Sequence, residues 1–157
     1  MRPDPKSGTA LSAAVLAACL GLGFPALPAG AGLFSATGEV IALLADELFV
    51  GEAEGHLNGS GTLSIRSQKN PAIVCLGQFT SSAALGGSGQ MQCSDGVTAT
   101  FHFQRLDVFR GHGAGVTSRG AMSFVYGLSA EEAAPYLKLP QGKKLAQRGT
   151  ALAMVDF

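Results

Sequence analysis

The sequence predicts an all-β protein, a small antiparallel meander that closes into a barrel or a sandwich, with one short C-terminal helix. Composition is the first observation behind this. The chain has 22 glycines in 157 residues, no tryptophan and only 14% charged residues, which is typical of turn-rich β structure. The second observation is that apolar and polar residues alternate with period two from Glu47 to Tyr126, broken by short turn signals. Such alternation indicates antiparallel strands.

Length and composition divide the chain into three parts. A chain of 157 residues is long enough for one core. We expect residues 1–31 to be a signal peptide, or a lipoprotein signal with its tether. Residues 39–140 form the predicted β-rich globular domain, and residues 141–157 are a C-terminal tail or a last strand. The 11 basic and 11 acidic residues balance, so no basic stripe points to a nucleic-acid partner.

The N-terminus has the layout of a bacterial export signal. Arg2 and Lys6 precede an apolar run that starts at Ala13, as in secretory signals. Export predicts a location in the cell envelope, on the periplasmic side, either lipid-anchored or soluble in the periplasm.

Two cleavage sites compete in this segment. The first, Leu16-Ala17-Ala18-Cys19, is similar to a lipobox and makes Cys19 the lipidation site. The second is the small-x-small triplet Ala29-Gly30-Ala31, which would release a soluble protein starting at Gly32. The lipobox is preferred because it follows an apolar run of normal length. An uncleaved membrane anchor is a third possibility, although glycines and prolines interrupt the run.

The two cysteines of the globular domain are predicted to form a disulfide. In a hairpin closed by residues 81–87, Cys75 falls opposite Cys93, Gly77 opposite Met91 and Phe79 opposite Gly89. Opposed Cβ atoms lie about 4.5–5.5 Å apart, within reach of a disulfide, and export favours oxidation. Free buried thiols and a metal or redox role are the alternatives. A zinc site would need two further ligands.

The first hairpin is predicted to turn at Asn58-Gly59-Ser60. A three-residue loop keeps the apolar residues of both strands on one face. It pairs Leu57 with Gly61, Gly55 with Leu63, Ala53 with Ile65, and Glu52 with Arg66.

Loops of odd length keep one parity on the inside of the sheet. Ser94-Asp95-Gly96 is a second three-residue turn, which places Val97 opposite Cys93. The predicted inward residues are Phe49, Ala53, Leu57, Leu63, Ile65, Ile73, Cys75, Phe79, Met91, Cys93, Val97, Ala99, Phe101 and Phe103. After residues 111–115 the parity is expected to change, so that Val116, Met122, Phe124 and Tyr126 carry the core. The glycines of that stretch predict a bulge or a sharp bend.

A short helix is predicted after the last of these strands. Ser129 and Glu132 have the spacing of a capping box, in which each side chain binds the other residue's backbone N–H. Pro135 is expected to end the helix early.

Several motifs together resemble a known group of proteins. They are G-E-A-E-G-H-L-N-G-S-G-T-L, C-L-G-Q-F, G-S-G-Q-M-Q-C-S-D-G, G-H-G-A-G and F-V-Y-G-L-S-A-E-E-A-A-P-Y-L. Over residues 51–140 the chain resembles uncharacterised proteobacterial exported proteins, often labelled lipoproteins, with a two-cysteine, glycine-spaced β core. The resemblance implies an envelope location and no particular activity.

Motifs for catalysis are weak. The glycines of residues 111–115 lack the strand-to-helix context of a phosphate loop. Ser60 and Ser88 do not lie in G-x-S-x-G, and no histidine and aspartate complete a triad. Asp95 is expected to cap its turn, and His102 is expected to face solvent. We therefore predict no catalytic, cofactor or metal-binding residue.

One outward face is a candidate contact surface. Glu52, Glu54 and His56 project from the same side of one strand, and Arg66 lies on the next strand. These residues could share a cation, but a solvated face explains them without a ligand.

The predicted function is that of a non-catalytic cell-envelope protein, a binding or structural module. Its expected partner is an envelope protein, a glycan or a lipid, and it would reach the membrane through its N-terminal lipid or anchor. The alternatives are a small metal-dependent or hydrolytic envelope enzyme and a small outer-membrane barrel.

Overall fold

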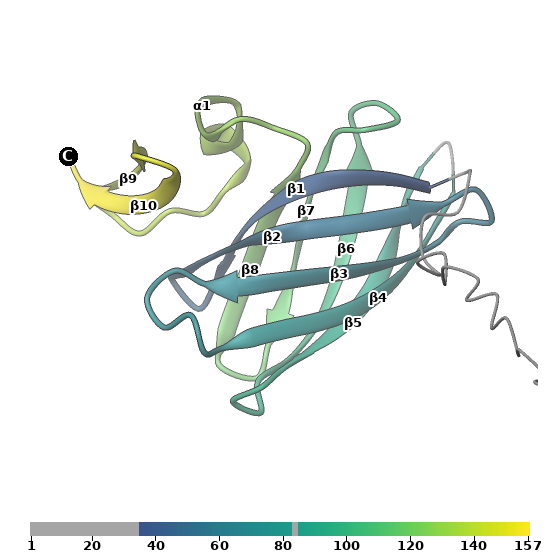
Figure 1. Cartoon of the computed structure of the whole chain (residues 1–157), viewed down its shortest axis with the longest axis horizontal. Coiled ribbons are helices and arrows are strands. Elements are labelled where there is room, and N and C mark those ends of the chain that lie inside the picture. The colour runs from purple at the N-terminus through teal and green to yellow at the C-terminus, as the bar shows by residue number, and fades with distance from the viewer. Residues whose placement is uncertain (1–34, 83–84) are drawn as a thin grey trace, which may run out of the picture. The chain divides into compact units, whose positions relative to one another are not determined.

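The computed structural model describes residues 35–82 and 85–157. The expected export signal and Cys19 lie outside the described residues. Eight antiparallel strands form a closed barrel, in which each strand pairs with the next and β8 pairs with β1 (Figure 1). The strands are β1 (Ser35–Leu44), β2 (Glu47–His56), β3 (Ser60–Ser67), β4 (Val74–Ser82), β5 (Gly86–Cys93), β6 (Thr98–Arg105), β7 (Gly111–Thr117) and β8 (Gly120–Tyr126). The predicted all-β meander is confirmed, and it closes as a barrel.

The second predicted hairpin, β4–β5, has the expected register. Cys75 lies opposite Cys93, and Phe79 lies opposite Gly89. The two cysteines form a disulfide. The following turn is also as predicted, because Val97 O accepts a 2.7 Å hydrogen bond from Cys93 N. These two turns fix the inward parity from β4 to β6.

The register predicted for the first hairpin, β2–β3, is wrong by two residues. Gly55 lies opposite Gly61 and Ala53 opposite Leu63, because the loop is Leu57-Asn58-Gly59. Gly59 takes a φ of +85°, which suits glycine at the last position of such a loop. The side chain of Asn58 also accepts a 2.9 Å hydrogen bond from Ser60 N. As a result Leu57 is 80% exposed and does not belong to the inward set.

The parity change predicted at residues 111–115 occurs one turn later. The ladders of β7 with β6 and β8 run without interruption from Gly111 to Thr117, so this stretch contains no bulge. The two-residue turn Ser118-Arg119 joins Thr117 to Gly120 and exchanges odd for even positions. Val116 therefore points outward and is 67% exposed, contrary to the prediction.

The other predicted core residues of β8 lie inside the barrel. Met122 and Phe124 are buried there, and Tyr126 packs against the same cluster. On the neighbouring strand β7, the residues at odd positions point into the same interior, and they are three glycines and Thr117.

A second apolar cluster covers the outside of the barrel. In β1 the run Val40–Leu44 is buried on both faces, since Val40, Ala42 and Leu44 point inward while Ile41 and Leu43 point outward. Leu48 and Val125 extend this outer patch. The C-terminal segment packs against it through a set of apolar side chains: Leu128, Ala133, Leu137, Leu145, Leu152 and Met154.

The segment that covers this patch contains the predicted helix. It consists of α1 (Ala130–Ala133), the 3-10 turn η1 (Ala134–Tyr136) and a separate hairpin of β9 (Lys143–Arg148) and β10 (Ala151–Asp156). The capping box is confirmed, since Ser129 Oγ accepts from Glu132 N and Glu132 Oε2 accepts from Ser129 N. Residues 143–156 thus form a hairpin of their own.

Candidate functional site

The two ends of the barrel differ in how their interiors are filled. We call the end with the hairpin turns β1–β2, β3–β4, β5–β6 and β7–β8 the closed end. The end where β1 begins, with the loops β2–β3, β4–β5 and β6–β7, is the open end (Figure 1). The candidate site is a cavity at the open end, and its position follows from the inward side chains.

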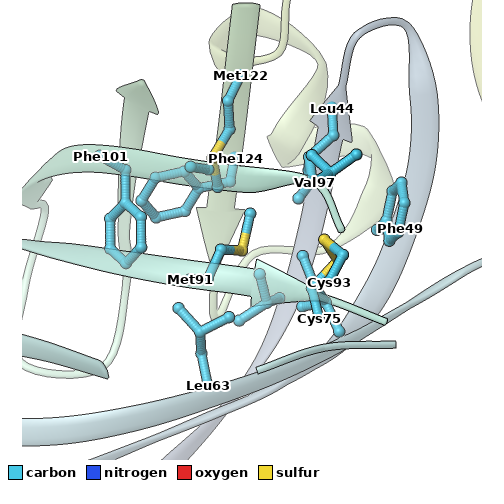
Figure 2. Close-up of a cluster of buried hydrophobic side chains, with 14 of the residues drawn as sticks. Leu44, Phe49, Leu63, Cys75, Met91, Cys93, Val97, Phe101, Met122 and Phe124 are labelled. Carbon is cyan, nitrogen blue, oxygen red and sulfur yellow. A yellow bond between two sulfur atoms is a disulfide. The ribbon is translucent and has the colours of Figure 1, made fainter. Parts of the chain in front are cut away.

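Large side chains and the disulfide fill the closed end. Leu44, Phe49 and Val97 pack around the Cys75–Cys93 bond (Figure 2). Cys75 is fully buried and the others are at most 7% exposed. This end is therefore an ordinary packed core.

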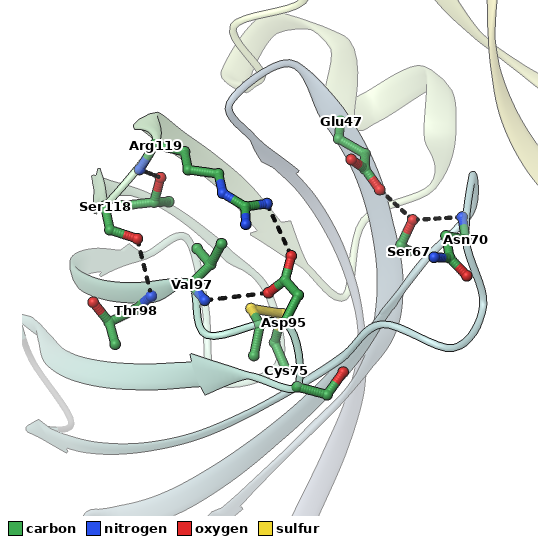
Figure 3. A network of polar contacts seen from close by, with 12 residues as sticks. Glu47, Ser67, Asn70, Cys75, Asp95, Val97, Thr98, Ser118 and Arg119 are labelled. Atoms are coloured by element: carbon green, nitrogen blue, oxygen red, sulfur yellow. Dashed lines mark hydrogen bonds and ion pairs between the residues drawn. A yellow bond between two sulfur atoms is a disulfide. The ribbon is translucent and has the colours of Figure 1, made fainter.

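Polar loops also tie this end together. The buried Ser67 Oγ donates to Glu47 and accepts from the backbone N–H groups of Lys69 and Asn70 (Figure 3). In the neighbouring β5–β6 turn, Asp95 accepts from Val97 N and pairs with Arg119 at 2.9 Å. Asp95 thus caps its turn, as predicted.

Toward the open end, aromatic rings lie over glycines of the neighbouring strands. Each ring faces a glycine directly across the ladder, so the missing side chain leaves room for the ring. The pairs are Phe79 with Gly61, Phe101 with Gly89, Phe103 with Gly87, Phe124 with Gly113 and Tyr126 with Gly111. The rings also contact each other edge to face at centroid distances of 5.3–5.9 Å, an arrangement favoured by aromatic quadrupoles. Alternation of large and small residues is common inside small barrels.

The opposite wall has no such rings. Ala36 and Gly38 on β1 and Ala53 and Gly55 on β2 line the interior. A Cβ atom built on Gly55 would come no closer than 3.9 Å to the ring of Phe79, and one on Gly38 no closer than 3.8 Å to any neighbour. Unlike the ring-covered glycines, these two border empty space.

A cavity of about 530 Å³ lies between the aromatic wall and the small wall. Leu63, Ile65 and Met122 also line it. Ligand cavities in proteins usually measure about 300–1,000 Å³ and are mostly apolar with a few polar groups. The open end thus has the size and lining of a small-molecule site.

Tyr126 lines this cavity and carries a buried polar group. Its hydroxyl is buried and has no hydrogen-bond partner among the described residues. Burial raises the pKa of Tyr126, an effect that nearby Arg105 opposes. The phenol is therefore neutral at physiological pH and keeps an O–H donor, a group that rarely remains unpaired when buried.

Arg105 stands at the mouth of the cavity. Its guanidinium donates to Ser82 O at 3.2 Å, to Ser81 Oγ at 2.9 Å and to Val108 O at 3.1 Å. These bonds join the strand end of β4 to the β6–β7 loop. Arg105 therefore holds the mouth together and places a positive charge beside it.

The predicted contact surface is brought together only in part. Glu52 and His56 are exposed on β2 with Glu54 between them, and His56 Nδ1 lies 3.9 Å from Glu54 Oε1. The expected pairing of Glu52 with Arg66 is wrong, since Arg66 lies opposite Val50 and donates to Pro71 O at 2.6 Å. The two-residue register error explains this difference.

The remaining sequence candidates lie apart from the cavity. Ser88 and His102 are exposed and face each other across β5 and β6, and Ser60 Oγ donates to Asn58. Within residues 35–82 and 85–157, no group of three or more histidine, cysteine or acidic side chains could hold a metal ion.

No protein-family model matches the chain, and no curated protein or solved structure is significantly similar to it. In the part of the chain that the structure describes, no helix is long and apolar enough to cross a lipid bilayer.

Sequence reasoning missed the cavity. The signal was the difference in side-chain size between strands, with only alanine and glycine at the open-end inward positions of β1 and β2. Because β1 lay outside the predicted strands, and the β2–β3 register was displaced, these small residues were not placed together.

Proposed function

We propose that this protein is a non-catalytic binding module of the bacterial cell envelope, and that its barrel takes up a small, mostly apolar molecule with a hydrogen-bond acceptor. The observation that carries this proposal is the cavity of about 530 Å³, whose lining includes Tyr126, a residue with a buried hydroxyl that has no partner among the described residues. An apolar ligand body would fill the space beside Ala53 and Gly55. Its acceptor would receive the Tyr126 O–H.

The ionisable groups of the cavity support recognition rather than reaction. His56, Arg105 and Tyr126 are the ones that line it among the described residues. A tyrosine with a raised pKa is a poor general base, and the guanidinium of Arg105 already serves three acceptors. The small hydrolase and the metal-dependent enzyme are therefore the weaker alternatives.

The outer wall of the barrel supports a domain that faces water. The outward residues of β2 to β6 are mostly hydroxyl, amide or charged side chains: Glu52, Glu54, Thr62, Ser64, Arg66, Gln78, Thr80, Ser88, Gln90, Gln92, Thr98, Thr100, His102 and Gln104. The interior is apolar. Barrels that span a membrane carry the opposite arrangement, with apolar residues outward, which makes that alternative weaker too.

The test fills the cavity and measures binding of anilinonaphthalene sulfonate, a fluorescent probe with an aromatic body and an anionic sulfonate acceptor. We expect Gly55→Leu to weaken probe binding at least tenfold, because the new side chain enters space that is now empty. Glu54→Leu adds the same side chain to the outer wall one residue away and should leave binding unchanged.

A second variant tests the polar contact. Tyr126→Phe keeps the ring and removes the donor, so affinity for a probe with an acceptor should fall about two- to tenfold, the usual value of one hydrogen bond. Thermal unfolding would verify that each variant is folded. A folded Gly55→Leu protein that binds the probe like the wild type would refute the proposed function.

A further inference from the structure

The loops of the open end carry an unusual set of exposed apolar side chains. We call them the apolar rim, and they come from three hairpin loops: Leu57 from β2–β3, Leu85 from β4–β5, and Leu106, Val108 and Phe109 from β6–β7. Their exposed fractions range from 45% to 83%. In the described part of the chain, exposed large apolar side chains of the barrel loops occur only at this end.

The loops of the closed end show that this distribution is not general. They carry Asp46, Lys69, Asn70, Asp95 and Arg119. Arg119 pairs with Asp95 at 2.9 Å, and Asn70 Oδ1 accepts from Ala72 N at 3.2 Å. Monomeric soluble proteins rarely expose clustered apolar side chains without an interaction partner. The asymmetry therefore singles out the open end as an interaction surface.

The most apolar loop of the rim is held in one conformation. Asp107 Oδ1 accepts from Phe109 N at 2.8 Å and from Arg110 N at 2.9 Å, and its other oxygen pairs with Arg110 Nε at 2.6 Å. Arg110 in turn lies 3.5 Å from Glu132. These bonds satisfy the carboxylate of Asp107 and fix the β6–β7 loop. The side chains of Val108 and Phe109 nevertheless stay exposed, at 68% and 63%.

The rim is also where the N-terminal segment joins the barrel. Ser35 begins β1 at the open end, and the 34 residues before it include the expected export signal and Cys19. If Cys19 is acylated, the 16 residues from Cys19 to Ser35 reach at most about 55 Å. An acylated chain would therefore be tethered to the leaflet from the open end of the barrel.

We propose that the apolar rim is a membrane-docking surface, and that the open end of the barrel rests on the lipid interface. Leu57, Val108 and Phe109 belong to the rim and also line the cavity. A docked rim would therefore let the cavity open toward lipid. Insertion of apolar side chains into the interface is the usual basis of such peripheral contact. The docking does not depend on the proposed function, because the rim exists whether or not the cavity holds a ligand.

The absence of tryptophan from the sequence allows a direct test with single reporters. Phe109→Trp and Leu57→Trp place a tryptophan in the rim. Leu76→Trp and Val116→Trp are matched controls, because Leu76 and Val116 are 63% and 67% exposed but lie on the outer wall. The full chain is bound to vesicles of phosphatidylcholine and phosphatidylglycerol, part of the phosphatidylcholine being brominated.

We expect the rim tryptophans to shift to shorter wavelength and to be quenched by the brominated lipid several times more strongly than the wall tryptophans. Val108→Glu, added to Leu57→Trp, should abolish this quenching while the barrel stays folded, as judged by thermal unfolding. Equal quenching of rim and wall reporters, stronger quenching of the wall, or no vesicle binding would each overturn the proposal. Probe binding measured without vesicles tests the cavity separately.

Discussion

The two ends of this barrel are built on the same ladder of strands, yet one is a packed core and the other a cavity. At the closed end Leu44, Phe49 and the Cys75–Cys93 disulfide fill the interior. At the open end the same strands β1 and β2 carry only Ala36, Gly38, Ala53 and Gly55 inward. An eight-stranded barrel is just wide enough to be filled by side chains or to hold one small ligand. The comparison teaches that side-chain size along a strand decides between these outcomes.

The loops follow the same division. Closed-end loops are polar and internally bonded, as in the contacts of Ser67 and Asp95 (Figure 3). Open-end loops carry the apolar rim. We therefore assign stability to the closed end and binding to the open end, and each prediction below compares the two.

The largest difference should come from truncating one apolar side chain at each end. Leu44 is 4% exposed, whereas Leu57 is 80% exposed. We expect Leu44→Ala to lower the free energy of unfolding by about 2–5 kcal/mol, through lost burial and the cavity left behind. Leu57→Ala should change it by less than about 0.5 kcal/mol. Urea denaturation measures both, and similar values for the two variants would contradict the division.

The disulfide should contribute the next largest effect. Its cysteines are separated by 18 positions in the chain, and closing a loop of this length stabilises a protein by roughly 3 kcal/mol in the chain-entropy model. We expect Cys75→Ala, Cys93→Ala and the double variant to lose similar amounts, since any of them removes the bond. Additive losses in the double variant would instead indicate two independent thiols. Probe binding at the open end should persist in whatever fraction stays folded.

Sequence reasoning recovered what depends on alternation and turn length. An odd loop keeps parity, so pairing Cys75 with Cys93 followed from the turn alone and was correct. The predicted loop of the first hairpin is displaced by one residue, and its register by two, because Leu57 looks like a core residue, while the positive φ of Gly59 decides the turn. The predicted inward parity of these strands is still correct, but the predicted burial of Leu57 and the predicted partner of Arg66 are wrong.

The candidate site was beyond the reach of that reasoning for a physical reason. The period-two alternation of apolar and polar residues shows which face of the sheet a residue lies on. It does not show whether side chains fill the space next to that face. The glycines at 111, 113 and 115 were interpreted as a bend, but the aromatic side chains of β6 and β8 lie over them. Only the three-dimensional pairing separates a glycine under a ring from one that borders empty space.

Those two kinds of glycine give a prediction of intermediate size. A Cβ on Gly113 would collide with the ring of Phe124, whereas one on Gly38 would make ordinary contacts at 3.8 Å. We expect Gly113→Ala to destabilise the fold by about 1–3 kcal/mol through overpacking. Gly38→Ala should be neutral, or stabilising by up to about 1 kcal/mol, because it restricts the unfolded chain. Equal losses would show that no empty space lies over Gly38.

The smallest loss of stability is expected from the hydroxyl of Tyr126. Because it is buried with no partner among the described residues, Tyr126→Phe should leave the free energy of unfolding at neutral pH unchanged or raise it by up to about 1–3 kcal/mol, the cost of burying an unpaired polar group. Burial raises the pKa of this tyrosine above its ordinary value of 10.0. The unfolded chain therefore ionises first as the pH rises. The stability linked to this group is complete below about pH 10 and is lost as the pH rises through the pKa of the folded protein.

Tyr126→Phe should remove that alkaline loss, and absorbance of tyrosinate during a pH titration follows it directly. The chain has two tyrosines, so Tyr136→Phe is the matched control and isolates the signal of Tyr126. A ligand that accepts a hydrogen bond from the phenol favours its protonated form, and bound ligand should move the titration of Tyr126 to still higher pH. If bound ligand leaves the pKa of Tyr126 unchanged, the acceptor does not reach Tyr126, and the open end recognises its ligand by apolar contact alone.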